Sequence, residues 1–290
     1  MSIIKSITAA FLALSALICC SCEAEEKAPA VDKRGSAKVL DGKTVVISIF
    51  ADDYLSSWDF ENEEDIATRD TTLENLGIAL DFLSENSRKW GKNAEFVYDW
   101  KENSDLSCQR SVPLEASNFE FKTSNYFSKI IDITIDDEAL LEKYDAENII
   151  YLYLFNTDFG HESTAQAFPY FGKSSTIYYH ETIGLPLKNG DQSISATVYA
   201  HEILHLFGAP DYYKSNSTFG VTDEYIEYCR ENHPKELMLT ARDENKKYVH
   251  GEITAEINEI TAYYIGWTDY SREVEDFGLP KSVHDTSDEK

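Results

Sequence analysis

Apolar and polar residues follow one another along the chain in the periods of both strands and helices. Apolar runs such as Thr-Val-Val-Ile-Ser-Ile-Phe-Ala at 44–51 and Ile-Ile-Tyr-Leu-Tyr-Leu-Phe at 149–155 predict buried strands. Leu73, Leu76 and Leu80 keep helical spacing and predict a helix that ends before Gly91. In chain order, the pattern predicts strands at 44–51, 94–100, 149–155 and 175–181, and helices at 71–90, 193–207, 223–230 and 252–265, with one or two helical segments at 125–144.

This alternation predicts an α/β (or α+β) domain with a mixed, twisted sheet, which we place at 41–270. Residues 156–173 form an 18-residue stretch with Gly160, Pro169 and Gly172, and we expect a loop there that borders a functional cleft. The polar residues 23–40 are expected to be a flexible tether, and the acidic residues 271–290 a disordered tail.

The first 22 residues have the pattern of an export signal. Lys5 is followed by a 12-residue apolar run at 7–18, which is too short to span a membrane. The cysteines at 19–22 resemble those of a bacterial lipoprotein signal, in which the cysteine at the cleavage point is lipidated. Cys20 and Cys22 both fit that position, and an ordinary secretory signal is the alternative. We therefore expect an exported protein, lipid-anchored on the cell envelope or surface.

The net charge of −26, from 52 acidic and 26 basic residues, limits the partners. It argues against nucleic acid, whose phosphates need a basic surface, and against electrostatic adhesion to anionic lipid. Membrane attachment is therefore expected only through a lipid anchor, and we expect a monomer. Calcium has no support, since no EF-hand loop is present. After removal of the signal only Cys108 and Cys229 remain, and whether they form a disulfide stays open.

The candidate chemistry lies in His201-Glu202-Ile203-Leu204-His205. Two histidines four residues apart fall on one face of a helix, close enough to bind one Zn²⁺. Glu202 stands beside them, where it can act as general base on a zinc-bound water. The spacing predicts one catalytic zinc ion.

The third ligand is expected from the residues that follow the helix. Gly208 can adopt the left-handed conformation that ends a helix, and Pro210 prevents its continuation. A chain reversed there can return Asp211 to the metal, which leaves one position open for chemistry. The alternative is a thermolysin-like site in which Glu224 or Glu227 is the third ligand.

The run HExxHxxGxxD at 201–211 resembles the zinc motif of the metzincin metallopeptidases, with Asp in place of the third His. Gly-Ala-Pro-Asp-Tyr-Tyr at 208–213 and Gly266-Trp267 are similar to the immune inhibitor A family of secreted bacterial peptidases. This resemblance implies a zincin domain with an active-site helix, an antiparallel edge strand (175–181) that holds the substrate, and a Met-turn at Met238. The implied activity is zinc-dependent endoproteolysis of extracellular proteins or peptides.

The sequence departs from this family at Thr240, where some metzincins have a tyrosine that binds zinc or stabilises the oxyanion. Tyr212, Tyr248 and His250 are the candidates to replace it. A function from another class also remains open, in which a surface lipoprotein keeps the fold and binds without catalysis.

Overall fold

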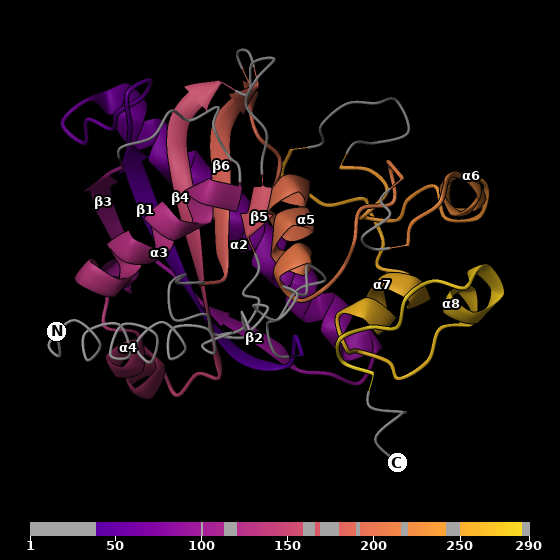
Figure 1. Ribbon diagram of the computed structural model, residues 1–290. Coiled ribbons are helices and arrows are strands. Elements are labelled where there is room, and N and C mark those ends of the chain that lie inside the picture. The colour runs from indigo at the N-terminus through magenta and orange to yellow at the C-terminus, as the bar shows by residue number, and fades with distance from the viewer. Residues whose placement is uncertain are drawn as a thin grey trace, which may run out of the picture. The chain divides into compact units, whose positions relative to one another are not determined.

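A mixed β-sheet with helices on both faces forms the centre of the molecule (Figure 1). The computed structural model describes residues 39–99, 101–112, 121–158, 166–168, 180–189, 192–215, 220–241 and 250–285. These residues all belong to one compact unit, Asp32–Lys290. The expected signal at 1–22 and nearly all of the expected tether lie outside the described residues.

Three long strands run parallel through the middle of the sheet. β1 pairs with β4, and β4 pairs with β6, both in parallel register. The short strands lie at the edges: β2 and β3 pair in parallel with successive halves of β1, whereas β5 and β7 run antiparallel to β6. The strands of the described residues are β1 Gly42–Asp52, β2 Ala94–Val97, β3 Ser107–Ser111, β4 Asn148–Asp158, β5 Gln166–Phe168, β6 Thr182–Asn189 and β7 Gln192–Ser193.

Both faces of the central strands are buried, as expected for parallel strands with helices on each side. Val45, Ile47 and Ile49 of β1 belong to one apolar cluster, and Val46 and Phe50 belong to another. The first cluster is completed by α3 and α4, and the second by α2 and α5, in agreement with the arrangement in Figure 1. The helices of the described residues are α2 Glu63–Lys89, α3 Phe121–Thr134, α4 Asp137–Tyr144, α5 Ala196–Leu206, α6 Asp223–Asn232, α7 Glu259–Tyr264 and α8 Arg272–Phe277, with a 3₁₀ turn at Ser104–Leu106.

The mixed α/β fold expected from the sequence is confirmed, but the prediction of a strand at 175–181 is wrong for residues 180–181. Residues 180–181 are irregular and the strand begins at Thr182, where Gly184 and Pro186 weaken the strand pattern. Pro186 is tolerated because β5 pairs only with residues 182–184 and β7 only with residues 188–189. The remaining residues of that expected strand, 175–179, lie outside the described residues.

The loop expected at 156–173 also contains structure. β4 continues to Asp158, and residues 166–168 form β5, the antiparallel strand at the end of the sheet path. The polar β3, Ser-Cys-Gln-Arg-Ser, was likewise not predicted, because its backbone pairing with β1 rather than an apolar pattern makes it a strand.

α2 and α7 differ most from their predicted bounds. α2 begins at Glu63 rather than at residue 71, because Asn62 caps it by accepting a hydrogen bond from the Glu64 N–H at 2.8 Å. Three acidic residues in its first turn complement the helix dipole. α7 is shorter than predicted, and residues 250–258 are irregular.

The prediction of a disordered tail at 271–290 is wrong for residues 271–285. α8 lies there, Leu279 is buried, and the Ser282 hydroxyl donates to the Tyr264 carbonyl at 3.0 Å. His284 Nε2 donates to the carbonyl of Phe207 at 2.9 Å. A few specific contacts thus order a segment whose average composition is polar.

The other end of the described chain packs against the same region. Leu40, expected at the end of the tether, is fully buried, and its carbonyl accepts a hydrogen bond from Trp267 Nε1 at 2.6 Å. Gly266 precedes that tryptophan with φ +79°, and a Cβ there would lie 2.7 Å from Val39 Cγ2. The close approach of these two segments therefore requires glycine at 266.

Cys108 on β3 and Cys229 on α6 are both free, so no disulfide joins them. Among the described residues, none of the helices combines the length and the apolar character needed to cross a membrane.

We predict that the C-terminal segment contributes measurably to stability. A chain that ends after Gly278 loses the buried Leu279 and the hydrogen bonds of Ser282 and His284. Its free energy of unfolding should fall by at least about 2–4 kcal/mol, because one buried leucine and several hydrogen bonds are lost together. Urea unfolding is the measurement. A chain that ends after Asp285 is the control and should match the full chain; equal midpoints for all three would contradict the docking.

We also predict that docking of this segment depends on pH. Burial lowers the pKa of His284, and the hydrogen bond to Phe207 offsets only part of that effect. The unfolded chain, with an imidazole pKa of about 6.5, takes up a proton before the folded chain does. Stability present above that pH is therefore lost as the pH falls below it.

The control is His284→Gln, because its amide can still donate to the Phe207 carbonyl but does not titrate. Unfolding in urea, measured at several pH values from about 7.5 down to about 5, should give a steeper loss for the wild type than for the variant. Parallel curves would show that His284 is not the titrating group.

Candidate metal centre

The helix α5 is held in the core on nearly all sides. Apart from His205, every residue of Ala196–Leu206 is buried, and the helix packs against α2, β5 and β6. Asn75 of α2 donates a hydrogen bond to the Ile194 carbonyl at 3.1 Å, one residue before the N-cap Ser195. The position of α5 relative to the sheet is therefore fixed by apolar packing and by this bond.

The chain reverses where α5 ends. The Gly208 N–H donates to the His205 carbonyl and the Ala209 N–H to the Leu204 carbonyl, both at 3.1 Å. Gly208 has φ 110°, a conformation that L side chains rarely adopt. The reversal returns Asp211 to the helix face that carries the two histidines, as the sequence predicted.

His201, His205 and Asp211 converge on one point. The two Nε2 atoms lie 3.1 Å apart, and Asp211 Oδ1 lies 3.1 Å from Nε2 of His201 and 3.2 Å from Nε2 of His205. Within the described residues, this is the only group of three or more His, Cys, Asp or Glu side chains whose ligand atoms come within 4.8 Å of one another.

Backbone carbonyls hold both imidazole rings in one tautomer. His201 Nδ1 lies 3.0 Å from the Leu237 carbonyl oxygen, and His205 Nδ1 lies 2.7 Å from that of Ala209. A carbonyl oxygen can only accept, so each Nδ1 must carry the proton and donate it. Each Nε2 is thereby left as the atom that faces Asp211, and it is the atom that would bind a metal ion once any proton on it is released.

The electrostatics of the three residues favour positive charge between them. Burial lowers the pKa of His205, but the hydrogen bond and charge of Asp211 outweigh it and raise that pKa to about 9. Burial raises the pKa of Asp211, yet the two histidines hold it well below its usual range. The carboxylate therefore stays ionised, as a metal ligand must.

Glu202 lies beside His201 on α5 and is buried, with 7% of its surface exposed. Burial raises the pKa of its carboxyl group, whereas His205 and His201 lower it. It interacts electrostatically with both histidines and with Asp211, but it contributes no ligand atom to the group.

A turn at residues 236–240 lies against the ligand group. The Glu236 carbonyl accepts hydrogen bonds from the Leu239 and Thr240 N–H groups, at 3.0 and 3.1 Å, which close the turn. Its Leu237 carbonyl binds His201, and its Met238 carbonyl accepts from the Tyr212 N–H at 2.9 Å. Met238 itself is fully buried.

The residues that the sequence offered for stabilising the oxyanion do not lie in comparable places. The Tyr212 side chain is fully buried, and its hydroxyl lies 3.5 Å from the Thr261 hydroxyl, inside the core. Tyr248 lies outside the described residues, and His250 is exposed.

Tyr213 was not predicted, although it directly follows Tyr212 in the motif. Its ring centre lies 6.2 Å from that of His201, and 46% of its surface is exposed. Burial, and then the charges of Asp211 and Glu202, raise the pKa of its hydroxyl. This is the exposed phenol of the described residues that borders the ligand group.

The alternative third ligands do not join the two histidines. Glu224 and Glu227 both lie on α6 and are exposed, and Glu227 forms an ion pair with Arg230. Neither contributes a ligand atom to the group formed with His201 and His205.

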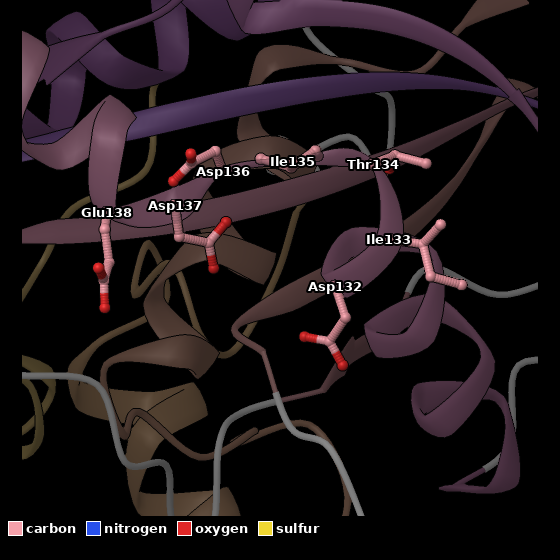
Figure 2. A pocket seen from close by; sticks show the side chains of 7 residues that line it. All are labelled: Asp132, Ile133, Thr134, Ile135, Asp136, Asp137 and Glu138. Carbon is pink, nitrogen blue, oxygen red and sulfur yellow. The ribbon is translucent and has the colours of Figure 1, made fainter.

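A second cluster of carboxylates lines a hollow of about 520 Å³ between the end of α3 and the start of α4 (Figure 2). Asp132 and Asp137 each place one oxygen 3.5 Å from His180 Nε2, and the Tyr151 hydroxyl donates to Asp137. These side chains do not bring three ligand atoms together within the described residues, so the hollow adds no support for calcium.

A scan against models of protein families matches none of them, and a search among curated proteins finds no similar sequence.

Proposed function

We propose that the chain is a zinc-dependent endopeptidase of the metzincin type, acting on extracellular proteins or peptides. The observation that carries this proposal is the convergence of His201, His205 and Asp211, with both histidine tautomers already set by backbone carbonyls. Zinc at His, His and carboxylate keeps a fourth position open, which is typical of catalytic rather than structural sites.

The dimensions of the group support zinc. A tetrahedral ion with bonds of about 2.0–2.1 Å keeps its ligand atoms about 3.3 Å apart. The three separations here are 3.1, 3.1 and 3.2 Å, so a small relaxation admits the ion. Calcium prefers six to eight oxygen ligands at longer distances, and two imidazoles suit it poorly.

In this proposal the roles are divided between the ion and the protein. Zinc, when bound, supplies a Lewis acid that lowers the pKa of a water molecule and polarises the scissile carbonyl. Glu202 takes the proton from the attacking water and passes it to the leaving amine nitrogen. His201, His205 and Asp211 hold the ion, and α5 keeps Glu202 beside it.

The edge of the sheet suits an extended peptide. β5 is the antiparallel strand at the end of the sheet path, and α5 packs against it. We propose that substrate adds to this edge as a further strand, so that its backbone runs past the ligand group. We therefore assign to β5 the substrate-holding role that the resemblance implied for residues 175–181.

The turn at 236–240 supports the metzincin assignment. Met238 lies 27 residues after Asp211, in a turn whose carbonyls contact His201 and the residue after Asp211. We propose that it is the Met-turn of this protein. Export and lipid anchoring through Cys20 or Cys22 remain proposals that rest on residues 1–22 of the sequence.

A non-catalytic role on the same fold is the second candidate, and it predicts bound zinc without turnover. The presence of Glu202, buried beside the ligands, argues against this alternative, because a binding protein has no need for a buried general base. The thermolysin-like alternative is disfavoured by the exposed positions of Glu224 and Glu227.

We predict near-stoichiometric zinc in the purified protein and a loss of zinc affinity of at least tenfold in Asp211→Ala, because one of three ligands is removed. Glu224→Ala is the matched control and should bind zinc as the wild type does. Metal content by mass spectrometry and competition with a chromophoric chelator are the measurements. The opposite result, loss in Glu224→Ala alone, would identify the thermolysin-like site.

We predict that Glu202→Gln keeps zinc and loses hydrolysis of casein or a peptide library by about 10²–10⁴-fold, the usual contribution of a general base. Glu231→Gln, which makes the same change on the exposed surface of α6, should retain full activity. Wild-type cleavage should also stop with a chelator. Equal activity in the two variants would remove Glu202 from the mechanism, and a zinc-loaded wild type without turnover would favour the non-catalytic role.

A further inference from the structure

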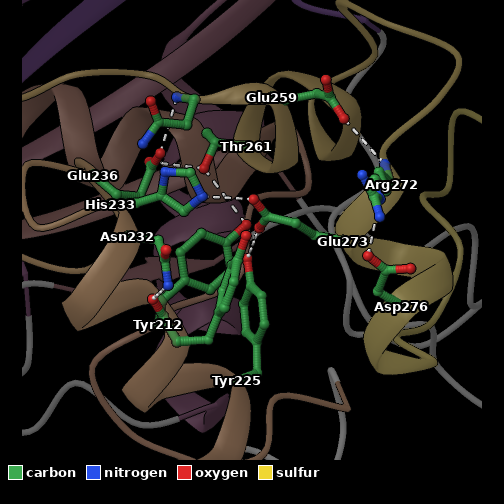
Figure 3. A network of polar contacts seen from close by, with 12 residues as sticks. Tyr212, Tyr225, Asn232, His233, Glu236, Glu259, Thr261, Arg272, Glu273 and Asp276 are labelled. Atoms are coloured by element: carbon green, nitrogen blue, oxygen red, sulfur yellow. Dashed lines mark hydrogen bonds and ion pairs between the residues drawn. The ribbon is translucent and has the colours of Figure 1, made fainter.

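Glu236 is a fully buried carboxylate at the start of the turn that contacts the ligand group. Figure 3 shows its side chain beside that of Thr261. Its Oε1 accepts hydrogen bonds from the Met238 N–H at 3.3 Å and the Thr261 hydroxyl at 2.9 Å. Its Oε2 accepts from the Asn258 N–H at 2.9 Å. Burying a carboxylate is costly unless several donors replace its water, and here three do.

These donors come from two segments of the chain. Met238 belongs to the turn itself, whereas Asn258 is the N-cap of α7 and Thr261 lies within that helix. Backbone bonds strengthen the same junction, from the Leu237 N–H to the Glu256 carbonyl and from the Glu256 N–H to the Lys235 carbonyl. Glu236 therefore fixes the turn to the start of α7.

The positions of two of the three candidate ligands, His201 and Asp211, depend on the position of this turn. The Leu237 carbonyl, next to Glu236, holds the His201 ring. The Met238 carbonyl holds the N–H of Tyr212, the residue after Asp211. A displacement of the turn by a fraction of an ångström would rotate His201 and shift Asp211, and metal affinity is sensitive to such changes.

We propose that Glu236 is a positioning residue of the metal centre, which sets zinc affinity by holding the Leu237 and Met238 carbonyls against His201 and Tyr212. This inference rests on the proposed zinc function. Glu236 itself does not touch the ion: it acts through the turn.

The carboxylate is required because all three partners donate to it. Glutamine keeps the size of the side chain but replaces one oxygen with an NH₂ group. That group would face either the Asn258 N–H or the Met238 N–H, so at least one buried donor would lose its acceptor. Isosteric replacement therefore disturbs the turn without creating a cavity.

The test compares Glu236→Gln with Glu231→Gln in the full-length protein. Zinc affinity is measured by competition with a chromophoric chelator, and the geometry of the site by the absorption spectrum of the Co²⁺-substituted protein. Urea unfolding of the metal-free proteins measures stability separately. We expect the zinc dissociation constant of Glu236→Gln to rise by at least tenfold with an altered Co²⁺ spectrum, and Glu231→Gln to match the wild type.

Unchanged zinc affinity and Co²⁺ spectrum in a less stable Glu236→Gln would overturn the proposal and leave a structural role alone. Failure of the wild type to bind zinc would instead overturn the proposed function, and this inference with it.

A second pair covers the case in which Glu236→Gln does not fold. Thr261→Val removes one donor to the carboxylate at nearly constant volume, whereas Thr261→Ser keeps the hydroxyl. We expect weaker zinc binding in the valine variant and recovery in the serine variant. Equal affinities in the two would contradict the proposal.

Discussion

The candidate site depends on the bond between His201 Nδ1 and the carbonyl of Leu237. Helical spacing alone brings two imidazoles to one face of α5, but it leaves each ring free to rotate about its side-chain bonds. Hydrogen bonds to two backbone carbonyls fix the orientation of the two rings. The one from Ala209 is local, since it follows from the way in which Gly208 ends the helix. The one from Leu237 comes from a turn 36 residues away, so the tertiary fold must be complete before both rings point at Asp211.

This division explains which parts of the site were predictable from the sequence. His201, Glu202 and His205 follow from spacing within one helix, and Asp211 from the chain reversal at Gly208. The Leu237 carbonyl has no signature in the sequence, because every residue carries a carbonyl. Glu236 reads as an ordinary charged residue in Pro-Lys-Glu-Leu-Met, and only its surroundings in the fold make it a buried acceptor.

In the fold, too, features that follow from the local sequence were predicted, whereas features that need tertiary contacts were not. The strands with apolar runs, β1 and β4, were predicted because burial on both faces requires such runs. β3 and β6 were not, since partner strands rather than their own composition make them strands. The C-terminal segment was misjudged for a related reason: its charged average hides Leu279 and His284. The hydrogen bond from His284 to the Phe207 carbonyl joins this segment to the C-cap of α5, two residues after the candidate ligand His205.

Apolar packing and polar contacts therefore determine different features of α5 and its ligands. Packing against α2, β5 and β6 positions the helix axis, but dispersion and burial are nearly non-directional and do not select a ring orientation. Hydrogen bonds are directional, so the angles of the ligands are set by carbonyls. The Leu237 and Met238 carbonyls are in turn held in place by the buried carboxylate of Glu236. An apolar residue at 236 would avoid the cost of burying charge, but it would leave the Asn258 and Met238 N–H groups without their acceptor and the turn without a fixed direction. A buried carboxyl group on the turn that contacts His201 is therefore best understood as the means by which the fold transmits its rigidity to the ligands.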